Sequence, residues 1–158
     1  MVNVCFEIET TRDIARQILR HRSFSFQELS QRYTVAPGFE MSEVRLQDTK
    51  NRQNSIEVGD SDMHHWWFQA QKRVRDDAEL LYNMALAKGV AKEQARKLLP
   101  EGMTMSRLYM NGTLRSWLHY VDIRCDAATQ KEHRDVAEKC RDELTKLFPN
   151  TMEAFNAQ

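Results

Sequence analysis

A cluster of arginine and hydroxyl side chains near the start of the sequence is its clearest chemical feature. Residues 20–33 hold three arginines, three serines, one histidine and one glutamate in fourteen positions. Arginine binds phosphate through paired hydrogen bonds, and serine hydroxyls and loop N–H groups supply further donors. The carboxylate of Glu28 is an acceptor for a ribose hydroxyl or an imide N–H. The segment therefore predicts a site for a nucleotide phosphate and a polar base.

Composition alone leaves other interpretations open. Arg20 and Arg22 stand at the expected end of a helix, where the helix dipole favours cations. Arg96, Arg115 and Arg124 form a second arginine series, and each of them fits a surface ion pair. An arginine-based nucleic-acid-binding module is a further alternative. However, 23 basic and 23 acidic residues leave no net charge, which argues against a polyanion binder.

Several common catalytic and cofactor motifs are absent from the sequence. The five glycines form no G-x-G-x-x-G, and no G-x-S-x-G supports a serine nucleophile, so we interpret Ser30 as a binding residue. The five histidines show no metal-ligand spacing, and three cysteines without a C-x-x-C pair fit neither a zinc site nor a disulfide framework. We expect no metal, and we expect Cys5 and Cys140 to be reduced and at least half-buried.

Size and composition indicate a single domain over residues 1–158. The sequence is 41% hydrophobic and 9% aromatic, which is enough for a packed core. No stretch approaches the roughly 18 apolar residues of a membrane span, and the first residues lack the pattern of a signal peptide. We therefore expect a cytoplasmic protein with neither a membrane nor a nucleic acid as partner.

Hydrophobic periodicity predicts the elements that position the arginine cluster. Residues 2–8 alternate apolar and polar side chains, as in a strand. Thr10 and Asp13 resemble a capping box, and the helix that they start is expected to end near Arg22. Residues 23–60 carry no sustained periodicity, which predicts a long loop that is functional or mobile.

The rest of the chain is predicted to be mainly helical. A long helix begins at Asp60 or Ser61 and ends before Gly89. Its expected inward stripe is Met63, Trp67, Ala70, Val74, Ala78, Leu81 and Ala85. The remaining elements are a short helix over 92–99 before Pro100, a strand over 103–110, a turn at Asn111-Gly112, a helix over 113–123 and a last helix over 128–148 followed by Pro149. The predicted fold is α+β, mostly helical with a small antiparallel-type sheet.

The order of residues in the arginine cluster is more specific than its composition. Arg20-His21-Arg22, followed after seven residues by Ser30, resembles the signature of the flavin-dependent thymidylate synthases, also called the thymidylate synthase complementing protein family. The resemblance continues through Ser25, Glu28, Arg32, Tyr33, Asn51-Arg52-Gln53-Asn54-Ser55, residues 95–100, residues 111–117, His119-Tyr120, Arg124, Gln130 and Glu132. It is collinear from about Phe6 to the last helix.

This resemblance implies a reaction, its cofactors and an assembly. Members methylate dUMP to dTMP, with methylenetetrahydrofolate as carbon donor and NADPH-reduced FAD as hydride source. They are homotetramers that hold FAD where subunits meet. We therefore expect a homo-oligomeric methyltransferase whose partners are dUMP, folate and further copies of the chain. Members usually extend further at the N-terminus, so the resemblance is to a short or N-terminally incomplete member. An inactive or truncated relative that only assembles and binds nucleotide is the alternative.

The resemblance also implies roles for individual residues. Those expected at FAD are Arg20, His21, Arg22, Glu28, Thr113, Arg115 and His119. Those expected at dUMP are Gln17, Arg20, Glu28, Ser30, Gln31, Arg32, Arg96 and Arg124. The spacing of Arg115 and His119 on one helix face agrees with a shared ligand. Arg124 is the expected catalytic residue, because its charge beside the imide edge of uracil would stabilise negative charge that develops on the ring.

Overall fold

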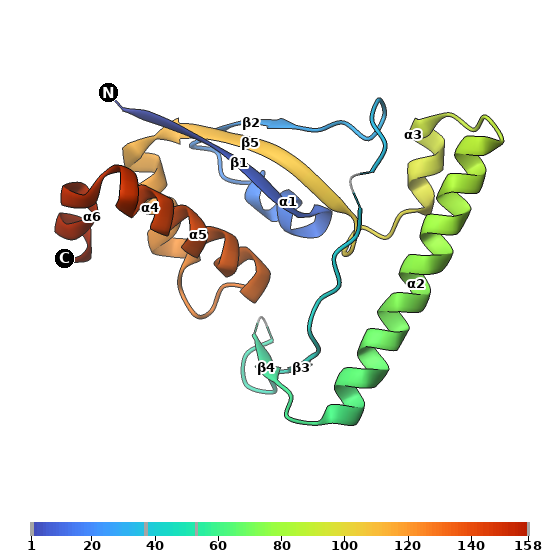
Figure 1. Ribbon diagram of the computed structural model, residues 1–158. Coiled ribbons are helices and arrows are strands. Elements are labelled where there is room, and N and C mark those ends of the chain that lie inside the picture. Colours follow the sequence, from blue (N-terminus) through green and yellow to red (C-terminus); the bar gives the residue numbers. More distant parts are fainter. Residues whose placement is uncertain (1, 37, 53, 158) are drawn as a thin grey trace.

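The protein has an antiparallel sheet with helices packed on one face and a long helix that stands apart from it (Figure 1). A computed structural model describes residues 2–36, 38–52 and 54–157. Its elements are β1 (Asn3–Thr11), α1 (Arg12–Ile18), β2 (Ser25–Glu28), β3 (Arg45–Gln47), β4 (Ser55–Glu57), α2 (Ser61–Ala87), α3 (Lys92–Ala95), the 3₁₀ turn η1 (Arg96–Leu98), β5 (Met105–Thr113), α4 (Leu114–Arg124), α5 (Lys131–Leu147) and α6 (Pro149–Asn156). The predicted α+β fold is confirmed.

The central strand of the sheet is β5, which pairs with β1 on one side and β2 on the other. The β1–β5 pairing is antiparallel over nine residues, with Ile8 opposite Leu108. Along both strands buried and exposed side chains alternate, because successive residues of a strand point to opposite faces. One face therefore packs against α1, α4 and α5, and the other faces solvent.

The core lies between this face and the helices. Ile14, Leu108, Met110, Trp117 and Leu144 are fully buried. Burial of each such side chain is worth about 1.5–3 kcal/mol relative to exposure. Because these residues come from α1, β5, α4 and α5, segments far apart in sequence are fixed together.

The predicted turn at Asn111-Gly112 is wrong, because β5 continues through both residues to Thr113. Gly112 does not have a positive φ. A Cβ atom at this position would lie 2.7 Å from Cε1 of the Phe24 ring, which is closer than side chains pack. Gly112 therefore makes room for Phe24, whose ring packs edge-on against Trp117. The glycine at this position reflects the close approach of the Phe24 ring and not a turn.

The helix after β1 is shorter than predicted and its cap differs. The N-cap is Thr11, which makes no capping hydrogen bond and instead donates to Asp13 Oδ1. The expected capping box from Thr10 is therefore wrong.

At the other end of the chain, Pro149 not only follows α5 but also starts α6, in agreement with the preference of proline for the first helical turn. Cys140 is buried as expected, whereas Cys5 is exposed, so that expectation is wrong.

The predicted loop over residues 23–60 contains three short strands. β2 extends the main sheet, and β3 and β4 form a separate two-stranded sheet. Strands of three or four residues are too short to show a reliable alternation in sequence. Gln53, which belongs to the matching block at 51–55, lies outside the described residues.

The bounds of α2 agree with the prediction, but its buried face does not. Asp60 caps the helix by accepting from the N–H of Asp62, and Gly89 follows it with a φ of 80°. The residues that α2 buries are Gln71, Ala78 and Tyr82. Of the expected inward stripe only Ala78 is buried, and Val74 and Leu81 are each 50% exposed. No helix over the described residues is long and apolar enough to cross a membrane.

Candidate active site

Arg124 and His21 meet at the edge of the packed helices. Arg124 is the last residue of α4, and its Nε donates to Nε2 of His21, 3.0 Å away, in the turn after α1. A guanidinium can only donate, so Nε2 of His21 accepts and His21 is neutral. The sequence prediction that these two residues share a site is consistent with this contact.

Two buried side chains, Tyr120 of α4 and His133 of α5, support the position of His21. His133 on α5 is fully buried, and its Nε2 lies 3.1 Å from the hydroxyl of Tyr120. The Tyr120 ring packs edge-to-face on His21, with ring centroids 4.9 Å apart. Nδ1 of His133 has no hydrogen-bond partner among the described residues. His21 is therefore held by α4 and α5 as well as by its own segment.

Burial and positive charge keep both histidines neutral. Desolvation, followed by the charge of Arg124 and the neighbouring His119, lowers the pKa of His21 to about 4. Desolvation, followed by the charges of Arg124 and His21, lowers the pKa of His133 to about 4. Protonation of His21 would break its hydrogen bond and place two cations together. The arrangement thus favours one positive charge at this position, on Arg124.

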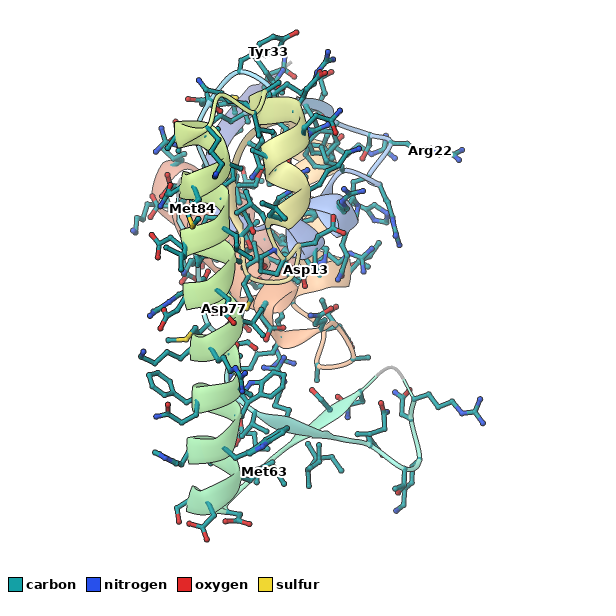
Figure 2. The ribbon with its side chains drawn as sticks, turned by 90° about the vertical axis from the view of Figure 1, so that its right-hand side faces the viewer. Asp13, Arg22, Tyr33, Met63, Asp77 and Met84 are labelled. Carbon is teal, nitrogen blue, oxygen red and sulfur yellow. The ribbon has the colours of Figure 1, made fainter. Side chains whose placement is uncertain are left out.

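The other residues expected at FAD present unpaired groups beside this cluster. Arg20, Arg22, Arg115 and His119 are exposed, and within residues 2–36, 38–52 and 54–157 none of them forms an ion pair. Figure 2 shows Arg22 extended away from the ribbon. Thr113 differs, because its hydroxyl caps α4 by accepting from the N–H of Ser116.

A second group of predicted residues lies beyond β2, beside α3. Arg32 pairs with Glu93 of α3 at 3.3 Å, and Arg96 donates to the backbone carbonyl of Glu93. The hydroxyl of Ser30 accepts from the backbone N–H of Arg32. Gln31 is 5% exposed, and its Nε2 lacks a partner among the described residues. The fold therefore brings Arg96 beside the segment Ser30–Arg32, and the assignment of these residues to dUMP stays a prediction.

Glu28 at the end of β2 stands between the two groups. Its Oε1 accepts from the hydroxyl of Ser106 at 2.6 Å and pairs with Arg12 at 3.4 Å. One carboxylate oxygen is thus held by the chain itself. The geometry fits a fixed acceptor whose second oxygen is available to a ligand.

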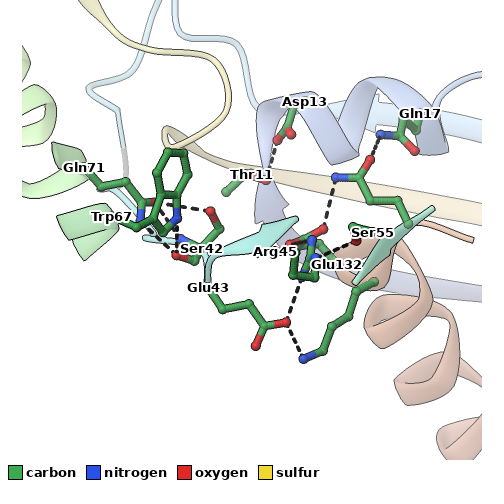
Figure 3. Close-up of polar contacts among 12 residues, drawn as sticks. Thr11, Asp13, Gln17, Ser42, Glu43, Arg45, Ser55, Trp67, Gln71 and Glu132 are labelled. Carbon is green, nitrogen blue, oxygen red and sulfur yellow. Dashed lines mark hydrogen bonds and ion pairs between the residues drawn. The ribbon is translucent and has the colours of Figure 1, made fainter. Parts of the chain in front are cut away.

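Among the described residues, the side chain of Gln17 makes its hydrogen bond to neither of the two arginine groups. Its Nε2 donates to Oε1 of Gln130, 2.8 Å away, just before α5. Gln130 in turn contacts Glu132, which pairs with Arg45 (Figure 3). Gln17 is therefore linked to the β3–β4 sheet.

The expected residues line neither of two neighbouring cavities of the chain. One of about 520 Å³ lies beside Trp66 and Trp67, and one of about 310 Å³ lies beside Arg52 and Arg134. Among the residues expected at FAD and dUMP, those on open surface are Arg20, Arg22, Arg32, Arg115 and His119, whereas Gln31 is buried. An open site of this kind fits completion by a second surface.

The sequence of this chain is similar to one family of proteins over most of its length. The sequence profile described as "Thymidylate synthase complementing protein" matches residues 1–150. The chain belongs to this family. It is 54% identical over 155 residues to the "Flavin-dependent thymidylate synthase" of Synechocystis sp., covering 98% of this chain and 72% of that one. It is 45% identical over 151 residues to the "Probable flavin-dependent thymidylate synthase" of Paramecium bursaria Chlorella virus 1, covering 95% and 69%.

A solved structure agrees with this family assignment. The UMP/dUMP methylase PolB from Streptomyces cacaoi, crystallised with 5-Br UMP, superimposes with a TM-score of 0.87 at 28% sequence identity. The match covers 98% of this chain and 74% of PolB. The membership in the flavin-dependent thymidylate synthase family inferred from the arginine motif is thus confirmed.

The residues present in this member of the family fit a bound FAD. Arg20, Arg22, Arg115 and His119 are exposed donors that form no ion pair with the described residues, and the charge of His119 acts on the neutral His21. A dinucleotide with a diphosphate needs such cations and N–H donors. His133 and Tyr120 are supporting residues that sequence reasoning missed. The available signal was the position of His133 on the apolar stripe of α5, where a buried histidine is unusual.

Proposed function

We propose that this member of the family is a flavin-dependent thymidylate synthase that methylates dUMP to dTMP. Methylenetetrahydrofolate is the carbon donor, and NADPH is the reductant. The observation that carries the proposal is the contact of Arg124 with His21, which joins the residue expected at the uracil ring to the motif expected at the flavin. The names of the relatives from Synechocystis and the Chlorella virus support the same reaction.

FAD supplies the hydride in this reaction, since no side chain can carry one. Arg20, Arg22 and Arg115 would hold its anionic groups, with His21 and His119 beside them. Thr113 would act through its position at the start of α4, because its hydroxyl is used by the cap. Neutral His21 adds no charge of its own to this surface.

The dUMP site in this proposal combines Arg124 with the group beside α3. Ser30, Arg32 and Arg96 suit the phosphate, because hydroxyl and guanidinium groups donate to it. Gln31 supports the assignment, because its buried Nε2 has no hydrogen-bond partner among the described residues. Arg124 would stabilise negative charge on the uracil ring during methylation, and the hydrogen bond to His21 fixes the direction of its guanidinium.

The proposed assembly is a homotetramer with active sites between subunits. The apolar face of α2 supports it, since Val74 and Leu81, which are two turns apart on one side of the helix, are each 50% exposed. Large apolar patches on a folded chain mark interaction surfaces. A second copy of the chain is the proposed occupant. We also propose that residues 1–158 form one domain of a cytoplasmic enzyme without a nucleic-acid partner, and the balanced charge supports the last point.

The proposal is tested by assaying the purified protein with FAD, dUMP, methylenetetrahydrofolate and NADPH. Wild type should form dTMP, and Arg124→Ala should lower turnover by about 100-fold or more while flavin absorbance is largely retained. Chromatography of the nucleotides measures turnover, and the visible spectrum measures bound flavin. Wild type that binds FAD yet forms no dTMP would contradict the function, and an Arg124→Ala variant with wild-type turnover would contradict the role of Arg124.

A further inference from the structure

A chain of polar side chains connects Gln17 to a charged pair on the β3–β4 sheet. Nε2 of Gln17 donates to Oε1 of Gln130 at 2.8 Å, and Nε2 of Gln130 donates to Oε2 of Glu132 at 3.0 Å. Oε1 of Glu132 accepts from Arg45. Figure 3 shows these contacts as one continuous line of side chains. We refer to these four residues as the relay.

The direction of every hydrogen bond in the relay follows from its charged end. A guanidinium only donates and an ionised carboxylate only accepts. Gln130 must therefore turn its NH₂ group to Glu132, which leaves its carbonyl oxygen for Gln17. Gln17 must then turn its own NH₂ group to Gln130. Its carbonyl oxygen, Oε1, makes no hydrogen bond to the described residues and is left as an acceptor for a ligand.

The charged end of the relay is held firmly. The side chain of Arg45 is 13% exposed and that of Glu132 is 29% exposed. Nε of Arg45 also donates to the hydroxyl of Ser55 at 2.9 Å, which ties the guanidinium to β4. Burial alone would raise the pKa of Glu132, but hydrogen bonds from Arg45 and Gln130 bring that pKa below its ordinary value. Glu132 is therefore ionised at neutral pH.

We propose that Arg45 and Glu132 are positioning residues that set the amide orientation of Gln17, so that its Oε1 accepts a hydrogen bond from dUMP. This inference rests on the proposed function and on the family resemblance, which implies that Gln17 lies at dUMP, and it adds how that side chain binds the nucleotide. The donor that this assigns is the imide N–H of uracil, which only donates and so cannot pair with the NH₂ group of a reversed Gln17. The sugar hydroxyl both donates and accepts, so a contact with it would survive the reversal.

Glu132→Gln tests the polarity of the relay, because a glutamine reverses it. Gln at 132 accepts from Arg45 and donates to Gln130, which then donates to Oε1 of Gln17 and leaves the Gln17 NH₂ group facing outward. The variant should bind dUMP about tenfold more weakly, since a donor then faces a donor. Isothermal titration calorimetry of the FAD-loaded protein measures the dUMP Kd, with flavin content expected to stay at the wild-type level.

Glu43→Gln is the matched control. Glu43 pairs with the same Arg45 but has no contact with Gln130. The control removes one carboxylate from Arg45 and leaves the polarity of the relay intact, so dUMP should bind within twofold of wild type. An equal loss of affinity in both variants would overturn the inference, because it would reflect charge near Arg45 and not the orientation of Gln17.

The double variant Gln130→Glu/Glu132→Gln should rescue binding. A carboxylate at 130 accepts from Gln at 132 and from Gln17, which turns Oε1 of Gln17 outward again. The dUMP Kd should return to within twofold of wild type. This rescue also separates polarity from folding, since a purely structural role of Glu132 predicts no recovery. A double variant that binds as weakly as Glu132→Gln overturns the inference.

Two analogues identify the donor on dUMP. N3-methyl dUMP lacks the imide N–H, and 2′,3′-dideoxyuridine monophosphate lacks the sugar hydroxyl. N3-methyl dUMP should bind wild type and Glu132→Gln alike, whereas 2′,3′-dideoxyuridine monophosphate should keep the tenfold difference. If N3-methyl dUMP also keeps it, Gln17 does not read the imide N–H and the inference is wrong. Wild type that binds no dUMP at all would overturn the proposed function, and wild type that binds dUMP with an unaffected Glu132→Gln variant would overturn the relay alone.

Discussion

The sheet with its packed helices and the long helix α2 differ in how far their apolar side chains are buried. Around β5 the chain buries its own apolar residues, and Trp117, Leu108 and Leu144 are fully covered. Along α2 the apolar residues are left half-exposed, and the helix stands apart from the sheet (Figure 1). The first region is stable on its own contacts, whereas the second has the surface of a subunit interface.

The predicted site is divided in the same way. Arg124 and His21 belong to the packed region, since α4 and α5 hold them. Arg32 and Arg96 belong to the region of α3, which contacts α2. A rigid half-site beside an open half-site is the arrangement expected where each copy completes the site of another.

The largest effect is expected from a charge on the exposed face of α2. Leu81→Glu places a carboxylate where a second copy is proposed to pack, and an unpaired charge in an apolar interface is strongly disfavoured. The variant should dissociate and lose most of its turnover. Light scattering after size-exclusion chromatography measures the mass, and Asn83→Glu, on the opposite side of the helix, should keep the wild-type mass. A Leu81→Glu protein of unchanged mass would show that this face is not the interface.

A smaller effect is expected in the packed region on acidification. Because the pKa of His133 is about 4 in the folded chain and 6.5 for an ordinary histidine, the unfolded chain binds the proton first as pH falls. Stability from neutral His133 is therefore present above pH 6.5 and is lost towards pH 4, by about 2 kcal/mol between pH 7 and pH 5. Urea unfolding at the two pH values measures it. The free energy of unfolding of the His133→Asn variant should fall less between the two pH values. A fall equal to that of wild type would mean that His133 is not the group responsible.

The sequence predicted the elements well where their pattern was long. The nine-residue β1, the 27-residue α2 and the 17-residue α5 have enough residues to show a period. The short strands β2, β3 and β4 do not. The Asn111-Gly112 pair carries the signal of a turn, and only the three-dimensional contact with Phe24 shows why glycine stands there.

The site was predictable to the extent that one motif carries it. Residues 20–33 and Arg124 were assigned to the site through the family resemblance, and this assignment stays a prediction. The support from His133 and Tyr120 and the link from Gln17 to Arg45 were not predicted, because they join residues 13 to 113 positions apart in the chain. The prediction that this stripe of α2 is buried within the chain was wrong. An apolar stripe indicates a contact but does not specify whether the partner is the same chain or another copy.

The central claim is that one copy supplies Arg124 and another supplies Arg32 to the same site. Mixing Arg124→Ala chains with Arg32→Ala chains after reversible dissociation tests it directly. Each variant alone should be inactive, and random mixing should restore about a quarter of wild-type dTMP formation, because one site in four then receives both arginines. Mixed assemblies, verified by mass, that remain inactive would contradict the account.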